Sequence, residues 1–146
     1  MNTTTIHGGC HCGNLRFEFT TMRSPSALLV RACRCSFCHK HNARYSVDPH
    51  GRLEVRVRDP GELSRYRFAG ATADFLVCRQ CGVLCAVTSE IDGHLYGALN
   101  LATADNVDDR VLPFEYVDHD DESDAEQLAQ RQRVWIREVV VELGAD

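Results

Sequence analysis

Eight cysteines constrain this chain of 146 residues more than any other feature, because seven of them fall into three short clusters. The clusters are a C-x-C pair at Cys10 and Cys12, a C-x-C-x₂-C triple at Cys33, Cys35 and Cys38, and a C-x₂-C pair at Cys78 and Cys81. Eight cysteines are about 5.5% of the 146 residues, which is below the roughly 8–10% typical of a disulfide scaffold. A domain of this length also buries a core without disulfides. The clusters therefore indicate metal ligation or redox chemistry.

Zinc is the metal that this ligand pattern favours. Two cysteines at C-x₂-C spacing can reach one ion, and soft thiolates select zinc over magnesium or calcium. The spacings do not match those of ferredoxin iron–sulfur clusters. A redox C-x₂-C pair usually opens a helix in a βαβ unit, and neither C-x₂-C segment here precedes a helical pattern. Gly13 and Gly82, which follow the two pairs, favour the positive φ that such turns need.

The count of seven clustered cysteines separates two kinds of site. Structural zinc has four protein ligands, whereas catalytic zinc keeps a place for water or substrate. Joining the two pairs completes a four-cysteine site across distant segments and leaves the triple as a three-thiolate site with one open place. Spacing alone leaves other allocations open, and the candidates to complete the second site are Cys85, His11, His39 and His41. Because Cys85 lies in an apolar strand candidate, we expect it to be a buried core thiol.

Residue alternation predicts a mainly β, sandwich-like antiparallel fold. Apolar and polar side chains alternate with a period of two over residues 15–20, 52–58 and 65–68, as in strands with one buried face. Further strands are expected at residues 27–30, 75–77, 83–88 and 94–101, with turns at 48–51, 59–61 and 92–93.

The C-terminal part is the exception to this strand pattern. Ser123 and Glu126 have the spacing of a capping box, Trp135 follows at helical spacing, and Gly144 is a candidate C-cap. This pattern predicts a short helix near residues 124–138 that packs Trp135 onto the sheet. The β-branched run 139–141 leaves a strand open as the alternative.

Charge is unevenly distributed along the chain. The net charge of −5 argues against a globally basic nucleic-acid binder. Residues 31–70 carry nine basic and four acidic side chains, which predicts a surface that attracts anions, with solvated strand faces as the alternative. Residues 107–146 carry four basic and twelve acidic side chains. The chain has no apolar stretch of about 20 residues for a membrane span, and its N-terminus lacks a signal-peptide pattern, so we expect a cytoplasmic protein.

Taken together, the three cysteine motifs resemble those of the glutathione-dependent formaldehyde-activating enzyme family, which includes centromere protein V. The motifs are Gly-x-Cys-x-Cys-Gly, Cys-x-Cys-x₂-Cys and Cys-x₂-Cys-Gly, and the resemblance covers about residues 6–101. It implies an Mss4-like β fold for a single zinc-binding domain over residues 1–146, with an acidic C-terminal part at 107–146. It also implies a structural zinc on Cys10, Cys12, Cys78 and Cys81 and a catalytic zinc on Cys33, Cys35 and Cys38.

The sequence departs from the family pattern beside the metal motifs. Asn42 stands where the family usually has glycine, Val77 where it usually has phenylalanine, and Val83 where threonine is common. Asparagine tolerates the left-handed backbone better than most residues, so we expect the loop after the triple to be kept. The departures leave the metal ligands intact and affect the substrate pocket.

The function that the resemblance implies is a zinc-dependent carbon–sulfur lyase acting on a thiol–aldehyde adduct such as S-(hydroxymethyl)glutathione. The thiol of glutathione would occupy the open place at the triple, become a thiolate and add to a small aldehyde such as formaldehyde. His39, His41 or zinc-bound water is the expected proton donor, and the basic segment is expected to bind the glutathione carboxylates. The alternatives are a non-enzymatic zinc-binding module with two structural metals and a thiol-redox sensor. The sequence predicts no oligomeric state.

Overall fold

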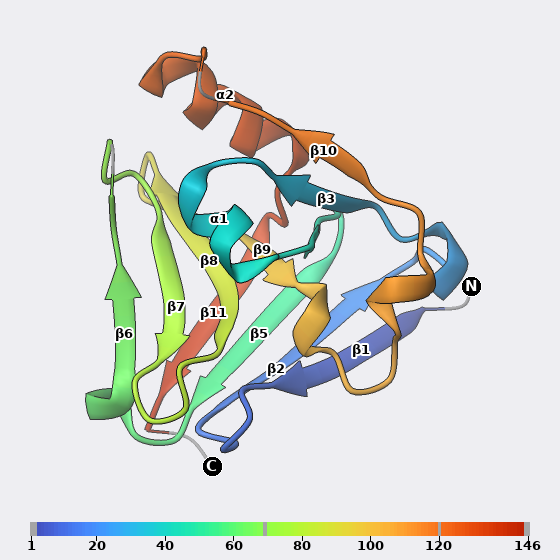
Figure 1. The fold of residues 1–146 in the computed structure, drawn as a ribbon, viewed down its shortest axis with the longest axis vertical. Coiled ribbons are helices and arrows are strands. Elements are labelled where there is room, and N and C mark those ends of the chain that lie inside the picture. Colours follow the sequence, from blue (N-terminus) through green and yellow to red (C-terminus); the bar gives the residue numbers. More distant parts are fainter. Residues whose placement is uncertain (1–2, 69, 120, 145–146) are drawn as a thin grey trace.

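The computed structural model describes residues 3–68, 70–119 and 121–144, which form two β-sheets that share a buried core (Figure 1). The four-stranded sheet has the order β1 (Thr4–Gly9), β2 (Leu15–Thr21), β5 (Arg52–Val57), β11 (Glu138–Leu143). The seven-stranded sheet has the order β10 (Glu115–Val117), β3 (Val30–Cys33), β4 (Tyr45–Ser46), β9 (His94–Asn100), β8 (Leu84–Ile91), β7 (Asp74–Cys78), β6 (Leu63–Tyr66). The predicted mainly β architecture is confirmed.

The α-helices among the described residues are α1 (Ser36–His41) and α2 (Asp124–Val134). Short 3₁₀ turns lie at Pro25–Ala27, Pro60–Glu62, Leu101–Thr103 and Asp109–Val111. Neither α1 nor α2 is long and apolar enough to cross a membrane.

Alternating side chains pair β2 with β5 at the centre of the four-stranded sheet. Phe17 lies opposite Val55 and Phe19 lies opposite Leu53, and all four side chains are buried. The other face of both strands carries the charged residues. This is the period-two pattern predicted from the sequence, and burial of its apolar face against the seven-stranded sheet stabilises the association of the sheets.

Several strands differ from the prediction, and β1, β3 and β6 show the reasons. β1 was absent from the prediction because Thr4–Gly9 contains Ile6 as its single large apolar side chain. β3 begins at Val30, since Pro25 starts a 3₁₀ turn in the segment before it. β6 lies two residues earlier than the predicted strand at 65–68.

The last two strands pair in parallel, which departs from the purely antiparallel prediction. β10 runs parallel to β3 at the edge of the seven-stranded sheet, and β11 runs parallel to β5 at the edge of the four-stranded sheet. Parallel neighbours need a long crossover connection, and the chain between β5 and β11 provides it. Alternation patterns predict that a segment is a strand, but not which partner it joins.

The C-terminal helix ends earlier than predicted. The capping box of Ser123 and Glu126 is present, and α2 begins directly after it. Trp135 leaves helical geometry, with φ of −75° and ψ of 160°. The prediction of a helix to residue 138 with Gly144 as its cap is therefore wrong, and the strand alternative for residues 139–141 is right, because these β-branched residues complete the edge beside β5. Trp135 packs against the core residues of the seven-stranded sheet, as predicted.

A backbone bridge fixes the end of α2 to β9. Ile136 is fully buried, and its backbone exchanges hydrogen bonds of 2.9 and 3.0 Å with Gly97. A Cβ atom at position 97 would meet a methyl carbon of Val139 at 3.1 Å, so glycine lets the two strands approach closely. The C-terminal segment is thereby held against both sheets.

Candidate metal sites and the adjoining cavity

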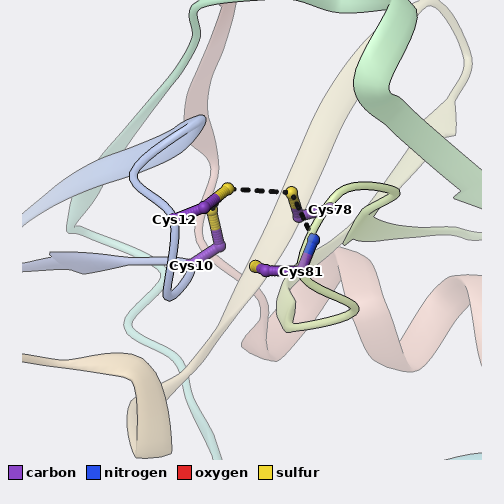
Figure 2. Close-up of side chains that lie close together, drawn as sticks. All are labelled: Cys10, Cys12, Cys78 and Cys81. Atoms are coloured by element: carbon purple, nitrogen blue, oxygen red, sulfur yellow. Dashed lines mark hydrogen bonds between the residues drawn. The ribbon is translucent and has the colours of Figure 1, made fainter.

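Four cysteines from two separate turns come together in one cluster (Figure 2). Cys10 and Cys12 lie in the turn after β1, Cys78 is the last residue of β7, and Cys81 lies in the turn that follows. Their sulfur atoms all lie within 4.8 Å of one another, with 3.7 Å between Cys10 and Cys12 and 3.5 Å between Cys12 and Cys78. Four sulfurs at about 2.3 Å from a tetrahedral zinc ion are about 3.8 Å apart, so this cluster can hold such an ion.

Backbone turns direct these sulfur atoms toward one point. Gly13 and Gly82 adopt φ values of 87° and 83°, as predicted for the residues after the two pairs. The amide of Leu15 donates a hydrogen bond of 3.2 Å to the sulfur of Cys10. The amide of Cys81 donates one of 3.4 Å to Cys78. These donors favour the thiolate, which is the form that ligates metal.

Cys85 lies in the core beside this four-cysteine cluster and changes the pKa of one of its members, Cys10. It is 1% exposed, which confirms the prediction of a buried thiol. Its hydrogen bond lowers the pKa of Cys10 to about 3, and the same bond raises the pKa of Cys85 itself. Burial raises the pKa of Cys78 to about 12. A metal ion would therefore displace the proton of Cys78 but find Cys10 already ionised.

The triple forms a second cluster, the three-cysteine site, within one short stretch of chain. Cys33 is the last residue of β3, Cys35 is the N-cap of α1, and Cys38 lies inside α1. Their sulfur atoms lie within 4.8 Å of one another. The backbone amide of Cys38 points at the sulfur of Cys35, at 3.4 Å. The three sulfurs fit three corners of a tetrahedral metal site.

A helix begins inside this motif, contrary to the prediction. Because α1 follows Cys35 directly, this C-x₂-C segment does precede a helix. The strands on either side of α1, β3 and β4, are antiparallel neighbours, so the βαβ setting of a redox pair is not formed here. Asn42 ends α1 in the left-handed region, with φ of 52° and ψ of 40°, which confirms that asparagine can replace the glycine of the family pattern.

Hydrogen bonds within the three-cysteine site place negative charge on Cys35. Bonds from Cys33 and then from Cys38 lower the pKa of Cys35 to about 2. The bond to Cys35 raises the pKa of Cys33, and bonds to Cys33 and Cys35 raise that of Cys38. The hydroxyl of Tyr45 lies 3.2 Å from the sulfur of Cys38, and burial raises the pKa of Tyr45, so this hydroxyl is neutral and able to donate to a thiolate at Cys38.

The other predicted ligands lie away from this site. Among the described residues, no fourth histidine, cysteine or carboxylate joins the three sulfurs. His11, His39 and His41 are exposed, and the ring of His41 packs on Phe37 with centroids 4.5 Å apart. Neither His39 nor His41 lines the adjoining cavity, so neither is positioned for the predicted proton transfer.

A cavity of about 180 Å³ adjoins the three-cysteine site, with all three cysteines in its wall. Its apolar lining residues are Val47, Phe68, Ala73, Phe75, Val87, Ala98, Val117 and Trp135. Its polar lining side chains are Arg31, Tyr45, Thr72, His119, Gln127, Gln130 and Arg131. Apolar walls with a few placed polar groups are typical of small-molecule sites.

The basic segment predicted to attract anions does not gather at this cavity. Among the described residues that line the cavity, Arg31 is the one that comes from the nine basic residues of this segment. Arg34 and Arg44 pack over the rings of Tyr116 and Phe114. Several others form ion pairs on the strand surfaces, which is the predicted alternative of solvated strand faces.

The C-terminal segment supplies lining residues that the sequence prediction missed. Gln127, Arg131 and Trp135 recur every four residues and so lie on one face of the chain through α2. His119 also reaches the cavity, and its Nδ1 lies 2.7 Å from a carboxylate oxygen of Glu122. The four-residue spacing could have predicted that these residues share one helical face. The acidic composition of the segment directed the prediction to its charge instead.

Comparisons with known proteins agree with this geometry. The profile of the family described as glutathione-dependent formaldehyde-activating enzyme matches residues 5–117, slightly more than the predicted 6–101. The structure also resembles the crystal structure of a Rhodobacter sphaeroides protein, with a TM-score of 0.59 and 25% sequence identity, over 76% of this chain and 99% of that chain. The matched region contains all seven clustered cysteines and ends before α2. The chain belongs to the glutathione-dependent formaldehyde-activating enzyme family.

Proposed function

We propose that this protein is a zinc-dependent carbon–sulfur lyase that forms and cleaves a thiol–aldehyde adduct such as S-(hydroxymethyl)glutathione. The observation that carries this proposal is the cavity in contact with Cys33, Cys35 and Cys38. Family membership supports an enzymatic role with glutathione and formaldehyde as the small-molecule partners. A purely structural zinc site uses four protein ligands, whereas the site beside the cavity offers three sulfurs. This difference favours an enzyme over a non-enzymatic zinc-binding module.

The two clusters take different roles in this proposal. Cys10, Cys12, Cys78 and Cys81 would hold a structural zinc that joins the turn after β1 to the turn after β7. Cys33, Cys35 and Cys38 would hold a catalytic zinc beside the cavity. The support for this division is that the first cluster offers four sulfurs and the second offers three.

The chemistry divides between the ion and the side chains around the cavity. Zinc at the three-cysteine site would lower the pKa of a substrate thiol and so supply a thiolate near neutral pH. Tyr45 holds Cys38 through its hydroxyl. Apolar side chains such as Phe75 and Val87 surround the same space, where charges interact more strongly than in water.

His119 is our candidate for the proton donor, in place of His39 and His41. When the thiolate sulfur bonds to the aldehyde carbon, the electron pair of the carbonyl bond moves to oxygen, and that oxygen takes up a proton. His119 lines the cavity, and Glu122 binds its Nδ1 at 2.7 Å, which leaves Nε2 to exchange a proton with the substrate. In the reverse reaction, the same imidazole removes the proton.

We also propose that residues 1–146 act as one domain in the cytoplasm. α2 contributes to the cavity, and β11 completes the sheet of β1, β2 and β5, which supports one domain. All eight cysteines are free, and a reducing compartment keeps them so.

Exchange between formaldehyde and glutathione, followed by NMR with zinc-loaded protein, tests the proposed activity. We expect the wild-type protein to raise the exchange rate in proportion to its concentration. Cys33→Ser should abolish this acceleration while the four-cysteine cluster keeps its metal. His39→Gln changes an exposed residue outside the cavity and serves as the matched control with the wild-type rate. A protein loaded with two zinc ions that leaves the exchange rate unchanged, with several thiols and aldehydes, would contradict the proposal.

A further inference from the structure

One side of the cavity is a row of apolar side chains that crosses three neighbouring strands. Phe75 of β7 lies opposite Val87 of β8, and Val87 lies opposite Ala98 of β9. All three residues line the cavity. They also belong to the same apolar cluster as the cysteines of the three-cysteine site. A group that reacts at these sulfurs would therefore lie beside hydrocarbon side chains.

Aromatic rings and small residues shape the rest of this apolar lining. The rings of Phe68 and Phe75 stack with their centroids 5.1 Å apart and their planes 26° apart. Trp135 lines the cavity from the end of α2. Ala73 and Ala98 are buried and carry only a methyl group, so they leave space that larger side chains would fill.

The polar side chains described in the wall already have partners within the protein. Arg131 donates a hydrogen bond of 2.9 Å to the hydroxyl of Thr72. Arg31 lies 3.9 Å from a carboxylate oxygen of Glu115 and donates to the amide oxygen of Gln130 at 3.0 and 3.1 Å. The other pairs are Gln127 with the backbone oxygen of His119, His119 with Glu122, and Tyr45 with Cys38. Because these groups already bond to protein, an apolar ligand would not deprive them of a partner.

The volume of the cavity exceeds what formaldehyde needs. The cavity measures about 180 Å³, whereas an apolar cavity of about 150 Å³ is large enough to bind benzene. Formaldehyde, the aldehyde in the family's name, has one carbon atom and no hydrocarbon group. It would leave most of this space empty, and the apolar walls would lose the contacts that a larger group provides.

We propose that the preferred aldehyde of this protein carries a branched or aromatic hydrocarbon group of up to about six carbon atoms, which fills the apolar cavity. This inference rests on the proposed function, since it names the aldehyde that reacts at the same site. Ala73 and Ala98 are then specificity-determining residues, because their small side chains set the space for the hydrocarbon group.

The reaction step is that of the proposed function. The thiolate sulfur bonds to the carbonyl carbon, the electron pair of the carbonyl bond moves to oxygen, and this oxygen takes a proton from His119. The hydrocarbon group stays on the same carbon and packs against side chains such as Phe75 and Val87. The reverse reaction breaks the carbon–sulfur bond and releases the aldehyde.

Exchange kinetics of the zinc-loaded protein with one thiol, glutathione, and a series of aldehydes test the inference. The aldehydes are formaldehyde, 2-methylpropanal, benzaldehyde and glyoxylate, with rates expressed per unhydrated aldehyde. Each buried methylene group contributes about fourfold. We therefore expect the acceleration for 2-methylpropanal and benzaldehyde to exceed that for formaldehyde at least about tenfold. Glyoxylate carries a carboxylate of similar shape in place of the isopropyl group, and it should not share this gain.

Fluorescence of Trp135 provides a readout that is independent of the reaction. Trp135 is the single tryptophan of the chain and lines the cavity. Toluene contains neither a thiol nor a carbonyl group, so its binding reports the apolar space alone. We expect toluene to change the emission of the zinc-loaded protein in a saturable manner.

Variants of the two alanines identify the residues responsible. Ala98→Leu and Ala73→Val each fill part of the cavity and should reduce the tenfold preference to about one, with weaker binding of toluene. If Ala98→Leu fails to fold, Ala73→Val decides the result. Ala129→Val changes an exposed alanine of α2 outside the lining and is the matched control, with the full preference.

The results that would overturn the inference are distinguishable. Equal acceleration of formaldehyde and the larger aldehydes, or greater acceleration of glyoxylate, overturns it and leaves the proposed function intact. Failure of toluene to change the emission of Trp135 also overturns it. A preference that survives in both alanine variants overturns the assignment to this cavity. Saturable binding of toluene without acceleration for any aldehyde overturns the proposed function, and with it this inference.

Discussion

The two cysteine clusters use the same ligand type in different structural settings. The four-cysteine cluster joins two turns whose cysteines lie 66 residues apart in the chain, from Cys12 to Cys78. The three-cysteine site is built on β3 and α1 alone and adjoins a cavity. A cluster that joins distant segments constrains the fold, whereas a local cluster can give up one ligand to chemistry. The division of ligands along the chain thus supports the different roles that we propose for the two clusters.

Removal of one ligand from the four-cysteine cluster should have the largest effect on stability. Cys78 is fully buried and connects β7 to the turn after β1. We expect Cys78→Ser to lower the free energy of unfolding by more than about 4 kcal/mol, because loss of a structural metal is among the most damaging changes. Denaturant unfolding with metal analysis measures this effect. An equal loss of stability in Cys35→Ser would show that the clusters do not differ in this way.

The complementary change at the three-cysteine site should affect the reaction instead. We expect Cys35→Ser to lower the rate of adduct exchange by more than about 100-fold, the upper range seen when metal-site partners are removed. The unfolding midpoint should stay near the wild-type value, and one zinc ion should remain bound. The exchange assay and metal analysis of the same sample check both parts. A wild-type rate in this variant would remove Cys35 from the proposed catalytic site.

Proton release distinguishes the clusters further. At neutral pH the lowered pKa of Cys35 leaves it ionised, and the raised pKa values of Cys33 and Cys38 keep both protonated. Zinc binding must then release two protons, so affinity should increase as pH rises, by about 100-fold per unit between about pH 6 and 8. Calorimetry in buffers of different protonation enthalpy, with the four-cysteine cluster already loaded, counts these protons. Release of one proton or none contradicts this charge distribution.

The smallest expected effects come from the neutral donor beside each cluster. The hydroxyl of Tyr45 lies 3.2 Å from the sulfur of Cys38 at the three-cysteine site, and Cys85 forms a hydrogen bond with Cys10 at the four-cysteine cluster. We expect Tyr45→Phe to lower the exchange rate about tenfold and Cys85→Ala to weaken only the structural metal by a similar factor. The exchange assay and a chelator competition separate the two results. A slower reaction in Cys85→Ala would contradict independent roles for the clusters.

The parts of the site that the sequence predicts well are those fixed by local geometry. Spacing within each motif places the sulfurs of Cys33, Cys35 and Cys38 together, and Gly13 and Gly82 have the positive φ expected of them. These features depend on a few adjacent residues, so a pattern in the chain is enough to predict them. The alternation that forms β2 and β5 is local in the same sense.

The parts that the sequence did not predict depend on contacts between distant segments. Arg131 reaches the cavity through its bond to Thr72, which is 59 residues away in the chain. Tyr45 belongs to the site because α1 brings the sulfur of Cys38 next to its hydroxyl, and its position in a strand does not reveal this contact. The basic segment is predicted as a single charged surface, but strand pleating separates its side chains. Composition describes a segment, whereas a site is assembled from single side chains on several segments.

The bridge between Gly97 and Ile136 has a consequence for how ligands are received. Because it fixes Ile136, two residues after α2, to the central strand β9, the α2 side of the cavity is anchored to the sheet at this end. A ligand would then bind a cavity that is largely preformed on this side, so the protein loses little conformational entropy on binding. Substitutions on the cavity-facing side of α2 can therefore change ligand specificity without altering the cysteine ligands.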